Sequence, residues 1–119
     1  MKKFLTIIAF LMTSMSFSQD TITADQARNF IGKEVILKGR ISSVRLASEG
    51  KSTNLINIDR GYPNQIFTVV VSNQYIEERK LDLESSKGKF IVVKGTVSTY
   101  EKDPKKIPQI SNPVTFVIN

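Results

Sequence analysis

Apolar and polar positions alternate in short runs along much of the chain, and the runs end at glycine, proline or asparagine. The run from Thr53 to Asp59 predicts a half-buried strand with Ile56 and Ile58 pointing inward. The run from Phe67 to Val71 predicts the next strand, and Gly61 to Gln65 predicts a turn or loop between the two. This pattern favours a mostly β domain.

An internal repeat gives the strongest indication of architecture. The segment from Gly32 to Ser43, GKEVILKGRISS, recurs as GKFIVVKGTVST from Gly88 to Thr99. Both copies are rich in β-branched residues and carry a central glycine, Gly39 or Gly95, where a strand bulges or bends. Only two copies are present, so the repeat predicts two equivalent curved strands in one barrel rather than a solenoid.

Two helices are predicted around these strands. Thr23 and Gln26 have the spacing of a capping box, and Gly32 supplies a left-handed residue at the end of the first helix. The apolar residues that would form one buried stripe on this helix are Ala27, Phe30 and Ile31. Asn73 is predicted to cap a second, irregular helix from Gln74 to Ser86 that closes at Gly88.

The remaining segments are predicted to be turns and short strands. Glu49 to Ser52 is expected at a hairpin tip and Asp103 to Lys106 in a turn, while Ile107 to Ile110 and Val114 to Ile118 form the last strands. The order is helix, three strands, helix, then further strands. This is the layout of an all-β, five-stranded Greek-key barrel with one or two short helices, known as the OB-fold.

From about Thr23 to Ile110 the chain resembles the nucleic-acid-binding OB-fold domains that occur alone, or beside nuclease and phosphoesterase domains, in secreted bacterial proteins. The residues that carry the resemblance are Ile31 to Val35, Lys38 to Ile41, Leu55 to Ile58, Tyr62 and Pro63, Phe67 to Val71, and Gly88 to Gly95. These positions are mostly structural. The resemblance therefore indicates the fold more strongly than the ligand, because OB barrels host many ligands.

The N-terminus has the three parts of a signal peptide. Lys2 and Lys3 precede the apolar run Phe4 to Met12, which is shorter than the about 20 residues a membrane-spanning helix needs. Ser16 and Ser18 are small enough for the peptidase pockets, so cleavage is predicted between Ser18 and Gln19. We therefore expect a signal peptide over residues 1–18, an OB domain over residues 19–119, and a secreted or periplasmic product.

The amino-acid composition limits the kinds of functional site that this product can carry. The chain has no cysteine, hence no disulfide and no lipid-bearing cysteine, and without Lys2 and Lys3 its net charge falls from +6 to +4. This mild excess permits attraction to nucleic acid or another polyanion and equally serves solubility. Because histidine and cysteine are absent, the usual zinc sites, Ser-His-Asp triads and thiol nucleophiles are excluded. We expect no cofactor, metal ion or membrane span; the oligomeric state stays open.

An OB barrel presents its ligand face on the second and third strands with help from the first. Single-stranded nucleic acid is bound there by basic groups and aromatic rings. The candidate ligand-binding residues are Lys38, Arg40, Leu55, Asn57, Tyr62, Phe67, Tyr100, Lys102, Lys105 and Lys106. Structural roles compete with these assignments, since Phe67 leads an apolar run, Tyr62 precedes Pro63 in a loop, and Lys105 and Lys106 lie in a turn.

Three functions remain open. The leading hypothesis is a non-catalytic secreted module that binds single-stranded nucleic acid or another anionic polymer. The second is an envelope module that binds protein or oligosaccharide through Leu55, Tyr62 and Phe67. The third is a divergent enzyme of the thermonuclease kind, a family that shares the OB barrel and works with carboxylates and arginines, although that pattern is not evident here. The acids Glu77, Glu78, Asp82 and Glu84 are more simply explained as a solvated helix face.

Overall fold

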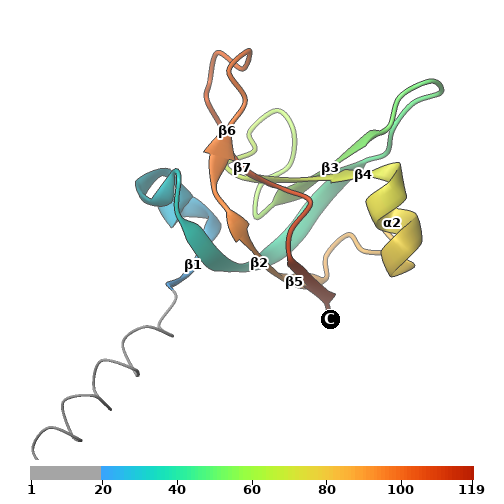
Figure 1. Ribbon diagram of the computed structural model, residues 1–119, viewed down its shortest axis with the longest axis horizontal. Helices are drawn as coiled ribbons and strands as arrows, with labels where there is room; N and C mark the ends of the chain where they lie inside the picture. The colour runs from blue at the N-terminus through green and yellow to red at the C-terminus, as the bar shows by residue number, and fades with distance from the viewer. Residues whose placement is uncertain (1–19) are drawn as a thin grey trace, which may run out of the picture.

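The computed structural model describes residues 20–119, which form one curled sheet with two short helices (Figure 1). The strands are β1 (Thr21–Ile22), β2 (Glu34–Arg45), β3 (Thr53–Ile58), β4 (Thr68–Ser72), β5 (Phe90–Thr96), β6 (Ser98–Thr99), β7 (Pro108–Ser111) and β8 (Thr115–Ile118). The helices are η1 (Ala24–Phe30), a 3-10 helix, and α2 (Asn73–Arg79). The predicted signal peptide lies outside the described residues, so its cleavage stays a prediction.

The sheet closes into the predicted barrel. Its strands follow the order β6-β7-β4-β3-β2-β5-β8, with β1 beside β2. β6 continues β5 after the single residue Val97, and β5 pairs with β2 while β6 pairs with β7. The ring therefore runs through β2, β3, β4, β7 and the β5–β6 segment, which confirms the five-stranded OB barrel. β1 and β8 add to its edges, and β8 confirms the predicted last strand.

The two repeated segments pair with each other. β2 and β5 are antiparallel, and Leu37 lies opposite Val93, its counterpart in the repeat. Gly39 lies opposite Ile91, and the repeat places Gly95 correspondingly opposite Val35. The two repeated strands thus pair with approximate two-fold symmetry, as expected for two equivalent curved strands.

Both central glycines allow another strand to approach closely. A Cβ on Gly95 would lie 2.5 Å from Cγ2 of Ile110, and a Cβ on Gly39 would lie closer than 3.0 Å to Cγ2 of Ile58. Real Cβ atoms essentially never approach so closely. The glycines therefore permit the close crossing of strands that a small closed barrel requires.

Alternation on each strand fills the barrel interior. Ile56 and Ile58 are fully buried, which confirms the predicted orientation of β3. The other large side chains with almost no exposed surface are Phe67, Leu37, Ile41, Ile91, Ile110, Val35, Val69, Val71, Val93 and Val97. Within residues 20–119 no helix is long and apolar enough to cross a membrane.

The first helix begins and ends as predicted but has a different geometry. The backbone N–H of Thr23 donates to Oε1 of Gln26 over 3.0 Å, and Gly32 has a φ of +87°. A 3-10 helix has three residues per turn, so Ala24, Ala27 and Phe30 share one face. Ile31 leaves that face and is 50% exposed, so its predicted burial was wrong.

The second helix begins one residue earlier and ends sooner than predicted. Oγ of Ser72, not the side chain of Asn73, accepts the backbone N–H of Tyr75 over 3.1 Å. Lys80 then adopts a left-handed conformation with φ +52°, which ends the helix long before Ser86. The Asn73 carboxamide instead accepts a hydrogen bond from Asn54 of β3 over 2.8 Å.

Candidate functional site

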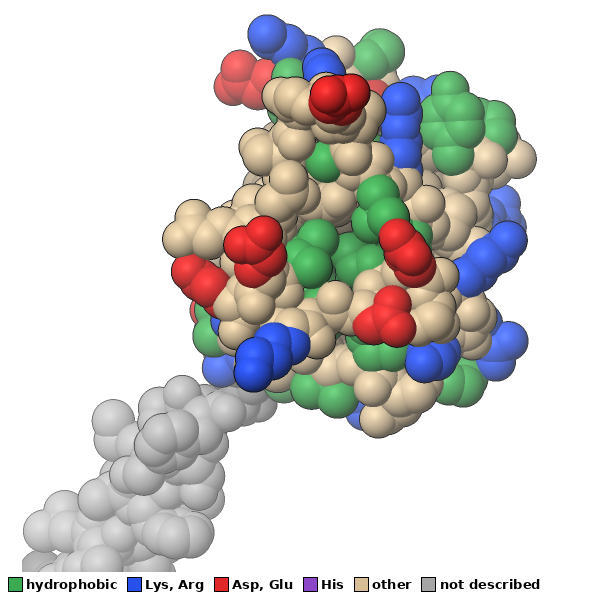
Figure 2. Space-filling view, turned by 90° about the vertical axis from the view of Figure 1, so that its right-hand side faces the viewer, with side chains coloured by type: hydrophobic (Ala, Val, Ile, Leu, Met, Phe, Trp, Pro, Cys, Tyr) green, Lys and Arg blue, Asp and Glu red, His purple; other side chains and the backbone are tan. Residues whose placement is uncertain are grey.

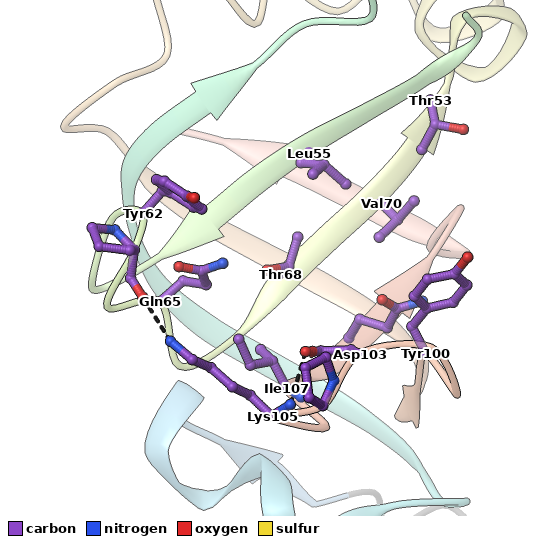
Figure 3. A pocket seen from close by; sticks show the side chains of 13 residues that line it. Thr53, Leu55, Tyr62, Gln65, Thr68, Val70, Tyr100, Asp103, Lys105 and Ile107 are labelled. Carbon is purple, nitrogen blue, oxygen red and sulfur yellow. Dashed lines mark hydrogen bonds between the residues drawn. The ribbon is translucent and has the colours of Figure 1, made fainter.

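A groove of about 710 Å³ lies over the outer face of β3 and β4 (Figure 3). Its floor comes from these strands and β7, and its walls come from two loops, which we name the 59–67 loop and the 100–107 loop. The lining residues are Thr53, Leu55, Tyr62, Pro63, Gln65, Thr68, Val70, Tyr100, Asp103, Pro104, Lys105, Ile107 and Gln109. This is the face on which an OB barrel is expected to bind its ligand.

An apolar row crosses the floor. Because Ile56 and Ile58 point inward, their neighbours Leu55 and Asn57 belong to the outer face. Leu55 pairs with Val70 of β4 on one side and with Arg45 of β2 on the other. Arg45 is exposed, so the row runs from a cation into an apolar floor.

A polar row runs parallel to the apolar one. Asn57 pairs with Thr68 of β4 and with Ser43 of β2. Oγ1 of Thr68 donates to Oδ1 of Asn57 over 3.0 Å, and Nδ2 of Asn57 donates to Oγ of Ser43 over 2.9 Å. Asn57 is only 5% exposed, so it stabilises the floor and presents almost no surface to a ligand.

Two tyrosines border the groove. Tyr62 of the 59–67 loop is 75% exposed and Tyr100 of the 100–107 loop is 54% exposed. Figure 3 shows them on opposite sides of the groove, with Leu55, Thr68 and Val70 between them. Tyr62 is joined to Pro63 by a cis peptide bond, and the N–H of Asn64 donates to the carbonyl of Gly61 over 2.9 Å.

Asp103 organises the 100–107 loop. Its carboxylate accepts the backbone N–H of Ile107 over 3.0 Å and that of Lys105 over 2.9 Å. These hydrogen bonds hold the pKa of the Asp103 carboxyl below its usual range, and the one from Ile107 contributes most. Asp103 thus accepts the two backbone N–H groups that shape the loop between Tyr100 and Ile107.

A buried acceptor without a partner lies in the wall. Oε1 of Gln65 is the buried side-chain polar atom that, within residues 20–119, finds no hydrogen-bond partner. A buried acceptor without a partner is costly, and a ligand carrying an N–H or O–H group could supply one. The groove thus combines aromatic rings, an apolar floor, and a hydrogen-bonding group.

Four of the ten predicted site residues line the groove: Leu55, Tyr62, Tyr100 and Lys105. Phe67 is completely buried in the core, so it does not belong to the ligand face. Lys102 and Lys106 lie in the 100–107 loop outside the lining, and Nζ of Lys106 donates to the carbonyl of Glu101 over 2.6 Å.

Lys38 and Arg40 lie on a different face. They belong to the part of β2 that pairs with β5, whereas the groove side of β2 begins at Ser43. The register shifts between Ile41 and Ser43, so the irregularity of β2 toward β3 lies here and not at Gly39, where the sequence predicts a bulge or bend. Val35, Leu37 and Ile41 all point inward.

The sequence interpretation missed Arg45, Gln65 and the β4 residues Thr68 and Val70. Arg45 follows the bulge, and the residue types around that bulge, two serines, do not indicate it. The β4 residues could have been found by applying to Thr68–Ser72 the same alternation that was applied to β3.

The side of α2 carries acidic as well as basic side chains. Figure 2 views this side and shows apolar side chains in a hollow with acidic side chains around it. A shallow hollow of about 210 Å³ here is lined by Leu46, Ile76, Leu81, Leu83, Asp82 and Glu84. Within residues 20–119 no three acidic side chains gather closely enough to hold a metal ion.

Comparisons with known proteins support the fold. No family model matches the chain, and no curated protein matches it. An OBody, AM2EP06, bound to hen egg-white lysozyme is similar with a TM-score of 0.60 and 16% identity over 86% of this chain and 94% of the OBody. A chain in the structure of yeast Stn1 and Ten1 gives a TM-score of 0.59 and 8% identity over 87% of this chain and 64% of the matched chain.

A tRNA synthetase is also similar over one part of its length. Asparaginyl-tRNA synthetase from Entamoeba histolytica has a TM-score of 0.59 and 17% identity, covering 85% of this chain and 24% of the enzyme. This chain therefore corresponds to about a quarter of that enzyme. At these identities the similarities establish the OB-fold and leave the ligand to the chemistry of the groove.

Proposed function

We propose that the groove binds single-stranded nucleic acid. The observation that carries this proposal is the pair of exposed tyrosines, Tyr62 and Tyr100, on opposite sides of the floor formed by Leu55 and Val70. Bases of a single strand stack on such rings, and their apolar faces fit an aliphatic floor. A binding module rather than an enzyme is the function this surface supports.

Cations at the border of the groove fit the phosphates. Arg45 extends the apolar row on the β2 side, and Lys105 lies in the wall of the 100–107 loop. Both are exposed, so each can contact a phosphate without a large desolvation cost. The resemblance to OB-fold domains and the similarity to a tRNA synthetase, whose name specifies an RNA substrate, support the same class of ligand.

The test is fluorescence anisotropy of residues 19–119 with labelled single-stranded DNA and RNA at low and near-physiological salt. Tyr62→Ala and Tyr100→Ala should each weaken binding by about tenfold, since stacking on one ring contributes about 1–3 kcal/mol. Tyr62→Phe keeps the ring and should bind like the wild type. Absence of salt-sensitive binding, or equal affinity of both alanine variants and the wild type, would overturn the proposal.

A protein or oligosaccharide ligand is the second candidate. The observation that favours it is the apolar floor with the unpartnered Oε1 of Gln65, which suits a ligand rich in hydroxyl or amide groups. The similar OBody is bound to a protein, lysozyme. The test is an NMR titration that follows the amide resonances of Leu55 and Gln65. This candidate is supported if oligosaccharides shift these resonances and oligonucleotides do not.

We also propose that the protein is exported before it binds. The support is the basic, apolar and small-residue order of residues 1–18. Expression in a bacterial host followed by intact-mass measurement should give a chain beginning at Gln19. A product that retains Met1 after export, or that stays in the cytoplasm, would contradict this.

A further inference from the structure

β2 connects the groove to a second face, which is formed by outward-pointing residues of β2, β5 and β8. Its residues are Lys38, Arg40, Phe90, Val92, Lys94 and Val117. Arg45 lies on the part of β2 that pairs with β3, while Lys38 and Arg40 lie on the part that pairs with β5. At about 3.3 Å per residue, Lys38 and Arg45 are roughly 23 Å apart along one strand. The strand β2 therefore carries cations both at the border of the groove and on the second face.

An aromatic ring lies at the centre of the second face. Phe90 of β5 is opposite Arg40 of β2, and it is 56% exposed. The Arg40 guanidinium carbon is 4.6 Å from the centroid of the Phe90 ring. This stacked pair offers both a positive charge and an extended flat surface, the two groups that bind a nucleotide without sequence preference.

The neighbouring rows repeat the mixture of cations and apolar groups. Lys38 pairs with Val92, which pairs with Val117 of β8, and Val117 is 45% exposed. In the next row Lys94 of β5 lies between β2 and β8. Among the described outward positions of β2, β5 and β8 the one acidic residue is Glu34, at the far end of β2.

The carboxylate of Asp59 lies next to Arg40 of the second face. Oδ1 of Asp59 accepts the backbone N–H of Arg40 over 3.0 Å, so this oxygen is already engaged by the protein. Arg60, the next residue, is exposed and supplies a compensating positive charge. On the side of α2, acidic side chains surround a hollow and basic side chains lie farther out, so the charge there is mixed (Figure 2).

We propose that a nucleic-acid strand bound in the groove continues along β2 onto this second face, where Phe90 stacks with a base and Lys38, Arg40 and Lys94 contact phosphates. This inference rests on the function proposed above. It predicts a binding site longer than the groove, so the second face contributes to long strands and leaves short ones unaffected.

The test compares oligothymidylates of about 5 and about 15 nucleotides. Phe90→Ala should weaken binding of the long strand by about tenfold and leave the short strand unchanged. Combined replacement of Lys38, Arg40 and Lys94 by alanine should lower the salt dependence of long-strand binding by about 2 in log–log slope, at about 0.7 for each phosphate contact. Lys87→Ala removes one positive charge from the segment between α2 and β5 and serves as the control.

A second measurement does not depend on loss of binding. The chain has no tryptophan, so Phe90→Trp provides a single fluorescent reporter on the second face. Its fluorescence should be quenched by the long strand and unaffected by the short one. Long-strand binding that responds to Tyr62→Ala but not to the second-face variants would overturn this inference alone, whereas no binding of either length would overturn the proposed function as well.

Discussion

Nζ of Lys105 donates a hydrogen bond to the carbonyl oxygen of Pro63 over 3.4 Å and thereby joins the two loops that wall the groove (Figure 3). The bond is long and Lys105 is exposed, so the contact contributes little to folding. The ammonium group is therefore available to turn toward a ligand phosphate. In the proposed function, the same side chain spans the groove and supplies a positive charge to the nucleic acid.

Replacing Lys105 by alanine should weaken oligonucleotide binding with almost no loss of stability. We expect the salt dependence of binding to fall by about 0.7 in log–log slope, the value for one phosphate contact on a single strand. The free energy of unfolding should change by less than about 0.5 kcal/mol, as for other exposed positions. Anisotropy titrations at several salt concentrations and urea unfolding measure the two effects.

The controls for this prediction separate charge from position. Lys105→Arg keeps the cation in the wall and should retain the wild-type slope. Lys87→Ala removes the same charge away from the groove and should lower affinity far less. An equal decrease for Lys87→Ala and Lys105→Ala would show that only the net charge of the domain matters.

Gly39→Ala should destabilise the barrel by about 1–3 kcal/mol, the usual cost of overpacking a core. The added methyl group would collide with Cγ2 of Ile58, whose side chain is fully buried and therefore has little room to change its χ1 rotamer. Urea unfolding measures this cost. The loss should be accompanied by shifted NMR resonances of β3, because the strands must separate to accommodate the methyl group.

Gly88 provides a comparison, because a side chain there would destabilise the fold for a different reason than at Gly39. It has φ +87°, and no atom lies within 4 Å of the place where a Cβ would stand, so a side chain there meets backbone strain but no neighbour. Asn tolerates this conformation, so Gly88→Asn should cost less than Gly88→Ala. At Gly39 the order should reverse, because Asn is larger than Ala; the same order at both sites would contradict the steric explanation.

Much of the fold could be predicted because local patterns determine it. The repeated GlyLys segments identified the two strands that pair at the centre of the barrel, Leu37 against Val93. The alternation in Thr53 to Asp59 placed Ile56 and Ile58 in the core correctly. Signals of this kind depend on spacing along one element, and the sequence displays them directly.

The candidate ligand face was predicted less completely because its residues depend on register between strands. The bulge between Ile41 and Ser43 places Arg45 beside Leu55 at the border of the groove and leaves Arg40 on another face. Phe67 directly precedes β4 and its ring is buried in the core, whereas the next residue, Thr68, lines the groove. A one-residue change in register exchanges the two faces, and spacing alone does not determine it.

Tyr75→Phe should lower stability by about 1–2 kcal/mol. The Tyr75 hydroxyl donates to the carbonyl of Pro113 over 2.6 Å and is buried, so its removal leaves that carbonyl without this partner. The bond joins α2 to the chain just before β8. Hydrogen exchange of the β8 amides should therefore become faster in the variant than in the wild type.

The stability of the wild type should also fall at alkaline pH through Tyr75. Burial raises the pKa of the Tyr75 hydroxyl above 10, although nearby Arg79 opposes the shift. Because the folded pKa is the higher one, its contribution is complete below about pH 10 and is lost as the pH rises through the folded pKa. Urea unfolding between about pH 9 and 11 should show a smaller decline in Tyr75→Phe; equal declines would contradict this origin.

Protonation of Asp103 should disorder the 100–107 loop at low pH. The pKa of its carboxyl is held down by the N–H groups of Ile107 and Lys105, so the loop contacts are complete above about pH 3.9 and are lost as the pH falls through the lower, folded pKa. The amide resonances of Ile107 and Lys105 should shift together, with a midpoint below about 3.9. In Asp103→Asn this titration should disappear. Asp82, whose pKa is lowered by Ser85, gives the internal control, since the Ser85 amide should titrate alike in both proteins. A midpoint at or above 3.9, or a titration that persists in Asp103→Asn, would show that another group sets the shape of this wall.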